Sequence, residues 1–421
     1  MKMFCDCPEK IILSMQTAVP LWQRHAADNN TLVLGYGDKP SGSVERLIGA
    51  NILEGSSSRV IIDINGSYYR KYSGELRSRG FRVLHFSPCD TDTCYYNPLK
   101  YLKGRADITE FSNNIFYNTR SIFSEKDSDP FFVEAEKIML SCIIAYACDF
   151  GDGTFAGIGN IIYPFECFKE DVPLRFNAFE KTIAKAVKDY PDSLTAKFYE
   201  HPLISAAAPC TRRLLFESGI MRLSGLNYPG IMEIISSDDT DLDKLSDAGK
   251  TALFINFSQI VGKDGTPRQT GCKYPENKYE AGNILSRFML SQIFRLLLTQ
   301  DDPDGCSCLK VILGKLDGCR TLYVPRDAFL QPNAAVLAAF PAAGTGETLL
   351  ENKWDKFFQR FGNIITYGAC EQGTSKLLAG TVRKEIGLSV KKRSFRQVPC
   401  GYGILIQRST DIKAVSVEKN C

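Results

Sequence analysis

Three short apolar runs near the start of the chain predict buried β-strands. LVLGYG at residues 32–37 ends in glycines, VIIDIN at residues 60–65 is rich in β-branched side chains, and FRVLHF occupies residues 81–86. Between them, residues 43–53 and 67–79 mix apolar and polar positions in a way that suits a helix. Strands that alternate with helices form right-handed parallel crossovers, so we expect an α/β sheet.

The pattern becomes helical beyond residue 106 and returns to strands after residue 237. Amphipathic segments dominate the stretch between these points. We therefore predict an α/β domain formed by residues 1–106 and 238–421, interrupted by an all-α insertion at residues 107–237. The later strands are expected at residues 252–257, 311–316, 363–368 and 401–406, with an amphipathic helix at residues 283–298.

Length and composition are those of a globular protein. The 421 residues are 44% hydrophobic and 24% charged, enough for two or three packed units. The formal net charge is only +3, so nucleic-acid binding would need a local basic face. No apolar run reaches the roughly 18 residues of a membrane span, and the first residues lack the features of a secretory signal. We expect a cytoplasmic protein.

The fifteen cysteines indicate reduced thiols. Their number is odd and they are spread along the whole chain, which argues against a disulfide framework. Cys5 with Cys7 and Cys306 with Cys308 form C-x-C pairs that could bind a soft metal. However, the chain has three histidines, none near either pair, and a zinc site needs four converging ligands. We predict no metal.

The junction of the first strand with the first helix is where a nucleotide-binding α/β protein places its phosphate loop. Gly35, Gly37 and Gly42 provide the glycine-rich turn. Such a loop supplies backbone N–H groups, a Lys for the phosphate oxygens and a Ser or Thr hydroxyl for magnesium. Here Gly42 is followed by Ser43 and Val44, so the Gly-Lys-Thr end is missing. A simple glycine-rich turn is the favoured interpretation.

Two charged segments are weaker candidates for binding sites. Four aspartates between residues 238 and 243 lack the glycine and the terminal Glu of a calcium loop, so we expect a solvated acidic turn. A basic segment near the C-terminus could contact a DNA backbone. Glu385 interrupts it and no aromatic residues are interleaved for base stacking, so a solvated loop is favoured. Its cations are Arg383, Lys384, Lys391, Lys392, Arg393 and Arg396.

An ordered series of segments resembles the type IV secretion system coupling protein family, the TraG/TraD-like conjugative DNA-transfer ATPases. The resemblance covers nearly the whole chain. The motifs are weak singly and specific together. They are NNTLVLGYG at residues 29–37, VIIDINGSYYRKYSGELRSRGFRVLHF at 60–86, YNPLKYL at 96–102, DPFFVEAEKIML at 129–140, KTALFINF at 250–257, ILSRFMLSQIF at 284–294, and Trp354 with GNIITYGACEQGTSK at 362–376.

The resemblance implies a RecA-like, P-loop NTPase-type parallel sheet with an inserted all-α domain. It implies hexameric rings that use ATP to pass relaxase-bound DNA to a secretion channel. The implied partners are therefore the relaxase/DNA-transfer complex and type IV secretion components, with DNA contact and a mixed ring with active relatives as further options. The family has an N-terminal membrane anchor. We expect no transmembrane anchor in this chain, and a position in the cytoplasm or at the inner face of the cell membrane.

The resemblance also identifies the catalytic positions, and nearly all of them carry other residues. The family's own residues at these positions would hold the phosphates and magnesium and polarise the attacking water. Because they are replaced, we expect no cofactor. ATP with Mg would bind only if residual binding survives. Of the second-strand motif Asp-Pro-Lys-Gly-Glu, Asp63 and Gly66 remain. The substitutions are Ser43 for the loop Lys, Val44 for its Thr, Gly314-Lys315 for the Walker B Asp-Glu pair and Pro341 for the sensor Gln.

Three interpretations follow. The leading hypothesis is a degenerate coupling-protein-like member that acts by binding and does not hydrolyse ATP, because the metal ligands, phosphate Lys, catalytic acid and sensor are lost together. The first alternative is a working DNA-translocating ATPase in which Lys39 and Asp317 replace the lost groups. The second is a decaying gene product without a selected role.

Overall fold

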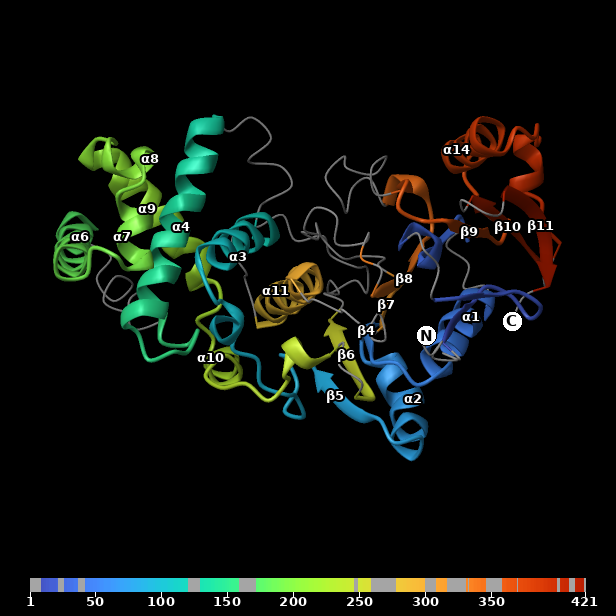
Figure 1. Ribbon diagram of the computed structural model, residues 1–421, viewed down its shortest axis with the longest axis horizontal. Coiled ribbons are helices and arrows are strands. Elements are labelled where there is room, and N and C mark those ends of the chain that lie inside the picture. The colour runs from blue at the N-terminus through green and yellow to red at the C-terminus, as the bar shows by residue number, and fades with distance from the viewer. Residues whose placement is uncertain are drawn as a thin grey trace, which may run out of the picture. The chain divides into compact units, whose positions relative to one another are not determined.

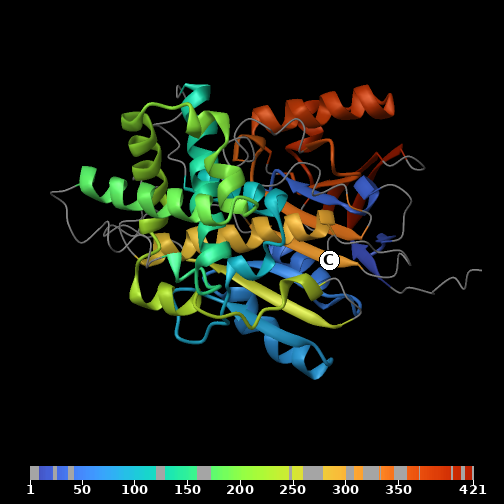
Figure 2. The same ribbon diagram turned by 60° about the vertical axis from the view of Figure 1, so that its left-hand side comes forward.

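The computed structural model divides the chain into two compact units (Figures 1 and 2). The sheet unit comprises Met1–His85, Asp243–Gln259 and Phe294–Cys421; the helical unit comprises Phe86–Leu242 and Ile260–Ile293. The three-part division at residues 107 and 237 stays a prediction. The structure describes residues 9–21, 26–36, 42–119, 129–158, 172–245, 249–258, 278–299, 308–315, 331, 333–345, 358–368, 370–399, 402–408 and 413–419.

Within the described residues, a nine-stranded sheet has the order β11-β10-β9-β3-β8-β7-β4-β6-β5. The pairs that join β9, β3, β8, β7, β4 and β6 are parallel, whereas β10 is antiparallel to both β9 and β11. The predicted α/β class is therefore confirmed. The strands are β3 (Thr31–Leu34), β4 (Arg59–Ile64), β5 (Arg82–Phe86), β6 (Thr251–Phe257), β7 (Leu309–Lys315), β8 (Ala334–Phe340), β9 (Asn363–Thr366), β10 (Tyr402–Arg408) and β11 (Lys413–Lys419).

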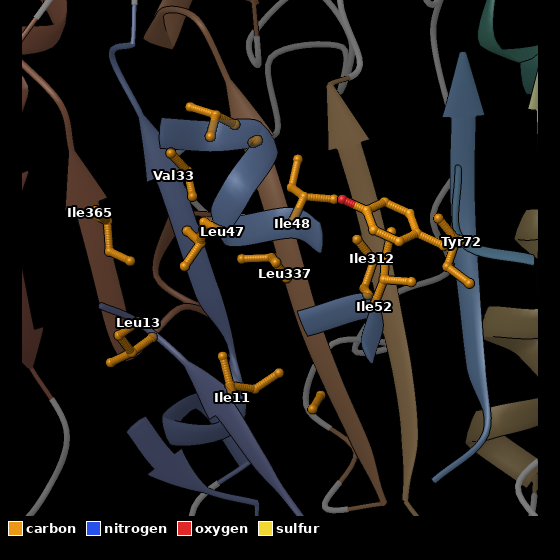
Figure 3. Close-up of a cluster of buried hydrophobic side chains, with 14 of the residues drawn as sticks. Ile11, Leu13, Val33, Leu47, Ile48, Ile52, Tyr72, Ile312, Leu337 and Ile365 are labelled. Carbon is orange, nitrogen blue, oxygen red and sulfur yellow. The ribbon is translucent and has the colours of Figure 1, made fainter. Parts of the chain in front are cut away.

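Helix α1 (Gly42–Leu53) connects β3 to β4, and α2 (Ser67–Ser78) connects β4 to β5. β3, β8 and β9 are buried along their whole length, as expected for parallel strands whose two faces are covered. One apolar cluster fills the space between α1 and the sheet (Figure 3). Its members include Val33, Leu47, Ile48, Ile52, Ile312 and Leu337.

A hairpin of β1 (Lys10–Ile12) and β2 (Ala18–Pro20) extends this cluster, because Ile11 and Leu13 belong to it. The buried Asn51 amide of α1 fixes the hairpin through Ile12, accepting a bond from its N–H at 2.8 Å and donating to its carbonyl at 2.9 Å. The start of the described chain is thereby bonded to the first helix.

The amino ends of β4 and β7 hold three buried charged residues, Glu9, Arg59 and Lys310, which we call the amino-end cluster. The Lys310 ammonium lies 2.9 Å from a Glu9 carboxylate oxygen, and both side chains are almost completely buried. Burial raises the pKa of Glu9, but the Lys310 charge and hydrogen bonds from Ser56 and Ser57 hold it at about 2. The Lys310 charge therefore compensates the burial of the Glu9 carboxylate.

In the helical unit, α4 (Pro130–Phe150) contacts α3 (Arg105–Asn118), α7 (Leu194–Tyr199), α8 (Pro202–Ser205) and α9 (Pro209–Ser224). The buried guanidinium of Arg222 on α9 donates to Glu136 of α4 at 2.6 Å and to the Phe116 carbonyl of α3 at 3.2 Å. One cation thus joins three helices. The unit also contains α6 (Val172–Asp189), α10 (Pro229–Ile234) and most of α11 (Lys278–Thr299), inside which the unit boundary falls.

In the acidic segment after α10, the side chain of Asp238 is buried and not solvated. The carboxylate of Asp238 is only 4% exposed and accepts bonds from Lys100 at 2.9 Å and from the Tyr101 hydroxyl at 2.8 Å. The Asn97 N–H also donates to it, at 3.1 Å. The expectation of a solvated turn was wrong here, because a basic and a hydroxyl side chain far away in sequence bury the carboxylate.

Candidate functional site

The carboxyl ends of β3, β8 and β9 are joined at Gly35, the first glycine of the predicted loop. The Gly35 N–H donates to the Phe340 carbonyl at 3.1 Å, and the Gly35 carbonyl accepts from the Thr366 hydroxyl at 3.1 Å. Gly35 has a φ of +76°, and a Cβ added there would collide with the thiol of Cys370. Glycine is required at this position both by backbone conformation and by space.

Helix α1 starts at the exposed Gly42, whereas Gly37 and the rest of the glycine-rich turn up to residue 41 lie outside the described residues. Ser43 is buried, and its hydroxyl accepts a bond from the Arg46 guanidinium at 3.3 Å. A Cβ added at Gly42 would lie 2.9 Å from another nitrogen of Arg46. A cation therefore lies against the first turn of α1, at the helix end that favours negative ligands.

Val44, which the sequence predicts in place of a magnesium-binding Thr, is fully buried in the apolar cluster under α1. A valine has no oxygen to offer a metal, and its methyl groups contribute to the contact between helix and sheet. The residue at this position stabilises the core.

Asp63 and Gly66 form the turn from β4 into α2. One Asp63 oxygen accepts from the Tyr68 N–H at 2.9 Å, and the other from the Tyr69 N–H at 2.7 Å. Burial raises the pKa of Asp63, and these hydrogen bonds oppose that rise. Gly66 has a φ of +67° and follows Asn65, whose φ is also positive. The two residues that survive from the family motif therefore cap the start of α2.

Gly314 lies where the strand β7 becomes irregular. Its φ is +34°, and the pairing of β7 with β8 shifts register between Ile312 and Lys315. A Cβ added at Gly314 would lie 3.0 Å from the Ile62 carbonyl and 3.5 Å from the ring of Tyr68. The backbone here is shaped for glycine, so a carboxylate could not be introduced without moving the strand.

Lys315 and Pro341 are the other two residues that the sequence predicts at altered catalytic positions. Lys315 ends β7 and pairs with Ala339, while its side chain lies outside the described residues. Pro341 directly follows β8 and is half-buried. A proline has neither the backbone N–H nor the side-chain amide with which a glutamine would sense a phosphate.

Helix α14 (Gln372–Thr381) supplies polar side chains next to these strand ends. The Thr374 hydroxyl accepts from the Ala343 N–H at 2.9 Å and donates to Glu371 at 3.3 Å. This contact joins the segment after β8 to the start of α14.

The contacts of Arg46, Thr366 and Cys370 were not recognised from the sequence. Only the spacing of Ser43 and Arg46, which lie one helical turn apart, gave a signal.

The predicted positions share one end of the sheet. Gly35, Asp63, Gly314 and Pro341 all lie at or just past the carboxyl ends of strands joined through parallel pairs, the place where open α/β sheets bind ligands. No group of three or more His, Cys, Asp or Glu side chains among the described residues could hold a metal ion. Cys5, Cys7 and Cys306 lie outside that part of the chain.

None of the helices that the structure describes has the length and apolar character of a membrane span. The largely parallel sheet, with α1 following β3 and a helical insertion between β5 and β6, has the arrangement of a P-loop NTPase-type α/β fold. A family model described as Type IV secretory system Conjugative DNA transfer matches residues 40–260, more than half of the 421 residues. The chain belongs to this family, and the predicted family is confirmed.

Solved structures of a coupling protein have the same fold. The unbound bacterial conjugative coupling protein TrwBΔN70 is 11% identical, with a TM-score of 0.64 over 94% of this chain and 86% of the solved chain. The plasmid coupling protein TrwB in complex with ADP and Mg²⁺ is 12% identical, with a TM-score of 0.65 over 94% of this chain and 85% of TrwB. At this identity the likeness concerns the fold alone. No curated protein matches the chain in sequence.

Proposed function

We propose that this chain is a coupling-protein-like member of a conjugative DNA-transfer system that acts by binding and does not hydrolyse ATP. The observation that carries the proposal is Gly314, at the place of a Walker B acid. Its positive φ and the Ile62 carbonyl 3.0 Å from an added Cβ mean that a side chain there would strain the backbone and displace its neighbour. A metal-dependent phosphoryl transfer needs carboxylates at this strand end.

The phosphate side of the site supports the same proposal. Val44 has no oxygen and is buried in the core, and the Ser43 hydroxyl is bonded to Arg46. The Arg46 guanidinium beside the first turn of α1 could still attract a phosphate electrostatically. TrwB has been solved with ADP and Mg²⁺, so residual nucleotide binding without turnover is part of the proposal.

The partners we propose are the relaxase/DNA-transfer complex and type IV secretion components. The sheet unit keeps the family fold, which would allow the chain to enter a ring with active relatives. The helical unit offers a second surface for recruiting the relaxase complex, and DNA contact is compatible with either role. We place the protein in the cytoplasm or at the inner face of the cell membrane.

The test is a calorimetric titration of the purified chain with Mg-ATP beside a steady-state phosphate-release assay, with an active coupling ATPase as the positive control. We expect no turnover. An Arg46→Ala variant should lose any residual heat of binding. As a matched control, Arg82→Ala removes an exposed arginine at the amino end of β5 and should leave that heat unchanged.

A second pair of variants tests the loop. If the turn keeps its geometry, Ser43→Lys with Val44→Thr should raise nucleotide affinity, because a phosphate-binding cation and a magnesium ligand return together. Turnover by the unmodified chain that disappears in Lys39→Ala or Asp317→Ala would contradict the proposal. It would favour the alternative of an ATPase with substituted residues; both positions lie outside the described residues.

A further inference from the structure

The segment that follows α14 is held at its two ends and exposed between them. It consists of the π-helical turn η5 (Val382–Ile386), a connection that contains Gly387 at a φ of +79°, and the 3-10 helix η6 (Lys392–Phe395). Val382 and Phe395 are fully buried, and η6 packs against α14. We call residues 382–396 the basic segment. Two buried apolar side chains anchor it, while most of the residues between them are exposed.

The basic segment carries six exposed cations and one acid. That acid, Glu385, interrupts the cluster in the sequence but not electrostatically. Both of its carboxylate oxygens accept bonds from the Arg408 guanidinium at 3.0 Å, and the Arg408 side chain is only 5% exposed. A buried cation of the neighbouring strand β10 thus neutralises Glu385. The exposed cations are Arg383, Lys384, Lys391, Lys392, Arg393 and Arg396.

An exposed aliphatic side chain lies between the two groups of cations. Leu388 is 49% exposed and follows the turn at Gly387. Across residues 382–399, all of which the structure describes, the one aromatic side chain is the buried Phe395. Base stacking on single-stranded nucleic acid needs exposed aromatic rings, and a phosphate backbone gains nothing from an exposed leucine.

We propose that the basic segment is a peripheral binding surface for an anionic lipid bilayer. Lysine and arginine side chains attract lipid phosphates, and each basic residue near such a surface adds a similar increment to binding. An aliphatic side chain among them can enter the boundary between headgroups and acyl chains. Six exposed cations lie on either side of the exposed Leu388, and the one acid, Glu385, is paired with the buried Arg408. This combination fits an anionic bilayer better than a nucleic acid.

The experiment is co-sedimentation of the full chain with vesicles of phosphatidylcholine containing phosphatidylglycerol, compared with phosphatidylcholine alone. We expect binding to the anionic vesicles that weakens as salt is added. Reversing three charges, K391E with K392E and R393E, should weaken the partition coefficient by about 100-fold or more. Leu388→Ser should weaken it by roughly 5-fold, through lost apolar burial.

The matched control reverses three exposed lysines of α6, K181E with K185E and K188E, which changes the net charge equally. It should keep vesicle binding within about 3-fold of the unmodified chain. The proposal is overturned if the unmodified chain does not bind anionic vesicles, or if the two triple variants bind equally. It is also overturned if the basic segment binds duplex DNA and not vesicles, which would assign it to a nucleic acid. Circular dichroism of each variant checks that it is folded.

Discussion

The two ends of the parallel strands use polar residues in opposite ways. At the amino ends, the amino-end cluster holds three buried charges, of which Lys310 and Glu9 form an ion pair at 2.9 Å. At the carboxyl ends, where the family has its catalytic groups, Val44 is in the core, Gly314 has no side chain, and Asp63 bonds to the N–H groups of α2. The buried ion pair of the amino ends thus contrasts with the carboxyl ends, where the proposed function has the groups that would act on a nucleotide replaced.

The largest effect should come from Lys310→Met in the amino-end cluster. We expect the free energy of unfolding to fall by about 3–5 kcal/mol, because Glu9 would stay buried without its closest cation. Urea unfolding monitored by circular dichroism measures this change. The control is Lys10→Met, whose ammonium lies 3.6 Å from Glu54 and is half exposed, and which should cost less than about 1 kcal/mol. Equal losses in the two variants would contradict the comparison.

Restoring an acid at the carboxyl ends should also destabilise the protein. Gly314→Asp is expected to cost about 2–4 kcal/mol, because the side chain meets the Ile62 carbonyl and the backbone φ is positive. Gly80→Asp separates these causes, since Gly80 has a φ of +83° with open space around its Cβ position. It should cost only about 1 kcal/mol. A Gly314→Asp variant as stable as the unmodified chain would show that the strand end can accept an acid.

The pH dependence of the free energy of unfolding should reflect the ionisation of Glu9 in the amino-end cluster. The pKa of Glu9 is held at about 2, below its ordinary value of 4.5. The stabilisation is therefore complete above pH 4.5 and is lost as the pH falls from 4.5 toward 2. We expect this loss to be on the order of 2 kcal/mol. Thermal unfolding between pH 2 and pH 6 measures it, and Glu9→Gln should remove this part of the dependence.

The smallest effect concerns the buried position on α1. Val44→Thr replaces a methyl group in the core by a hydroxyl, and we expect a cost of about 1–2 kcal/mol. Val417→Thr makes the same change at a position that is 63% exposed and should cost almost nothing. Differential scanning fluorimetry with and without Mg-ATP compares them. A rise in melting temperature of Val44→Thr on adding Mg-ATP would mean that the hydroxyl reaches a bound nucleotide.

The fold could be predicted from the sequence where apolar runs have β-branched residues and clear ends. β4, β6 and β9 are of this kind, and the helices α1, α2 and α11 followed from the spacing of apolar and polar positions. β8 is not among the strands that the pattern predicts, because AAVLAAF is rich in alanine, which has low β-propensity. β11 was also missed, although KAVSVEK has apolar side chains at alternating positions and pairs with β10 along its whole length.

The sequence offered positions for the candidate site, which stay a prediction, but not their local structure. The resemblance identified Ser43, Val44 and Gly314 as the altered residues. It could not indicate that Gly314 adopts a positive φ beside the Ile62 carbonyl, because backbone conformation depends on the neighbouring strand. In the same way, the pairing of Glu385 with Arg408 depends on β10 folding back onto the segment, and spacing in the sequence contains no sign of it.

The order of the strands has a consequence for synthesis on the ribosome. β3 is among the first strands to be made, yet both of its neighbours, β8 and β9, are made about 300 residues later. The centre of the sheet therefore stays open until nearly the whole chain has been translated. The helical unit, most of which is encoded between β5 and β6, can complete its own core earlier. Translation that stops before β8 should thus yield a chain with a folded helical unit and an unpaired, aggregation-prone β3.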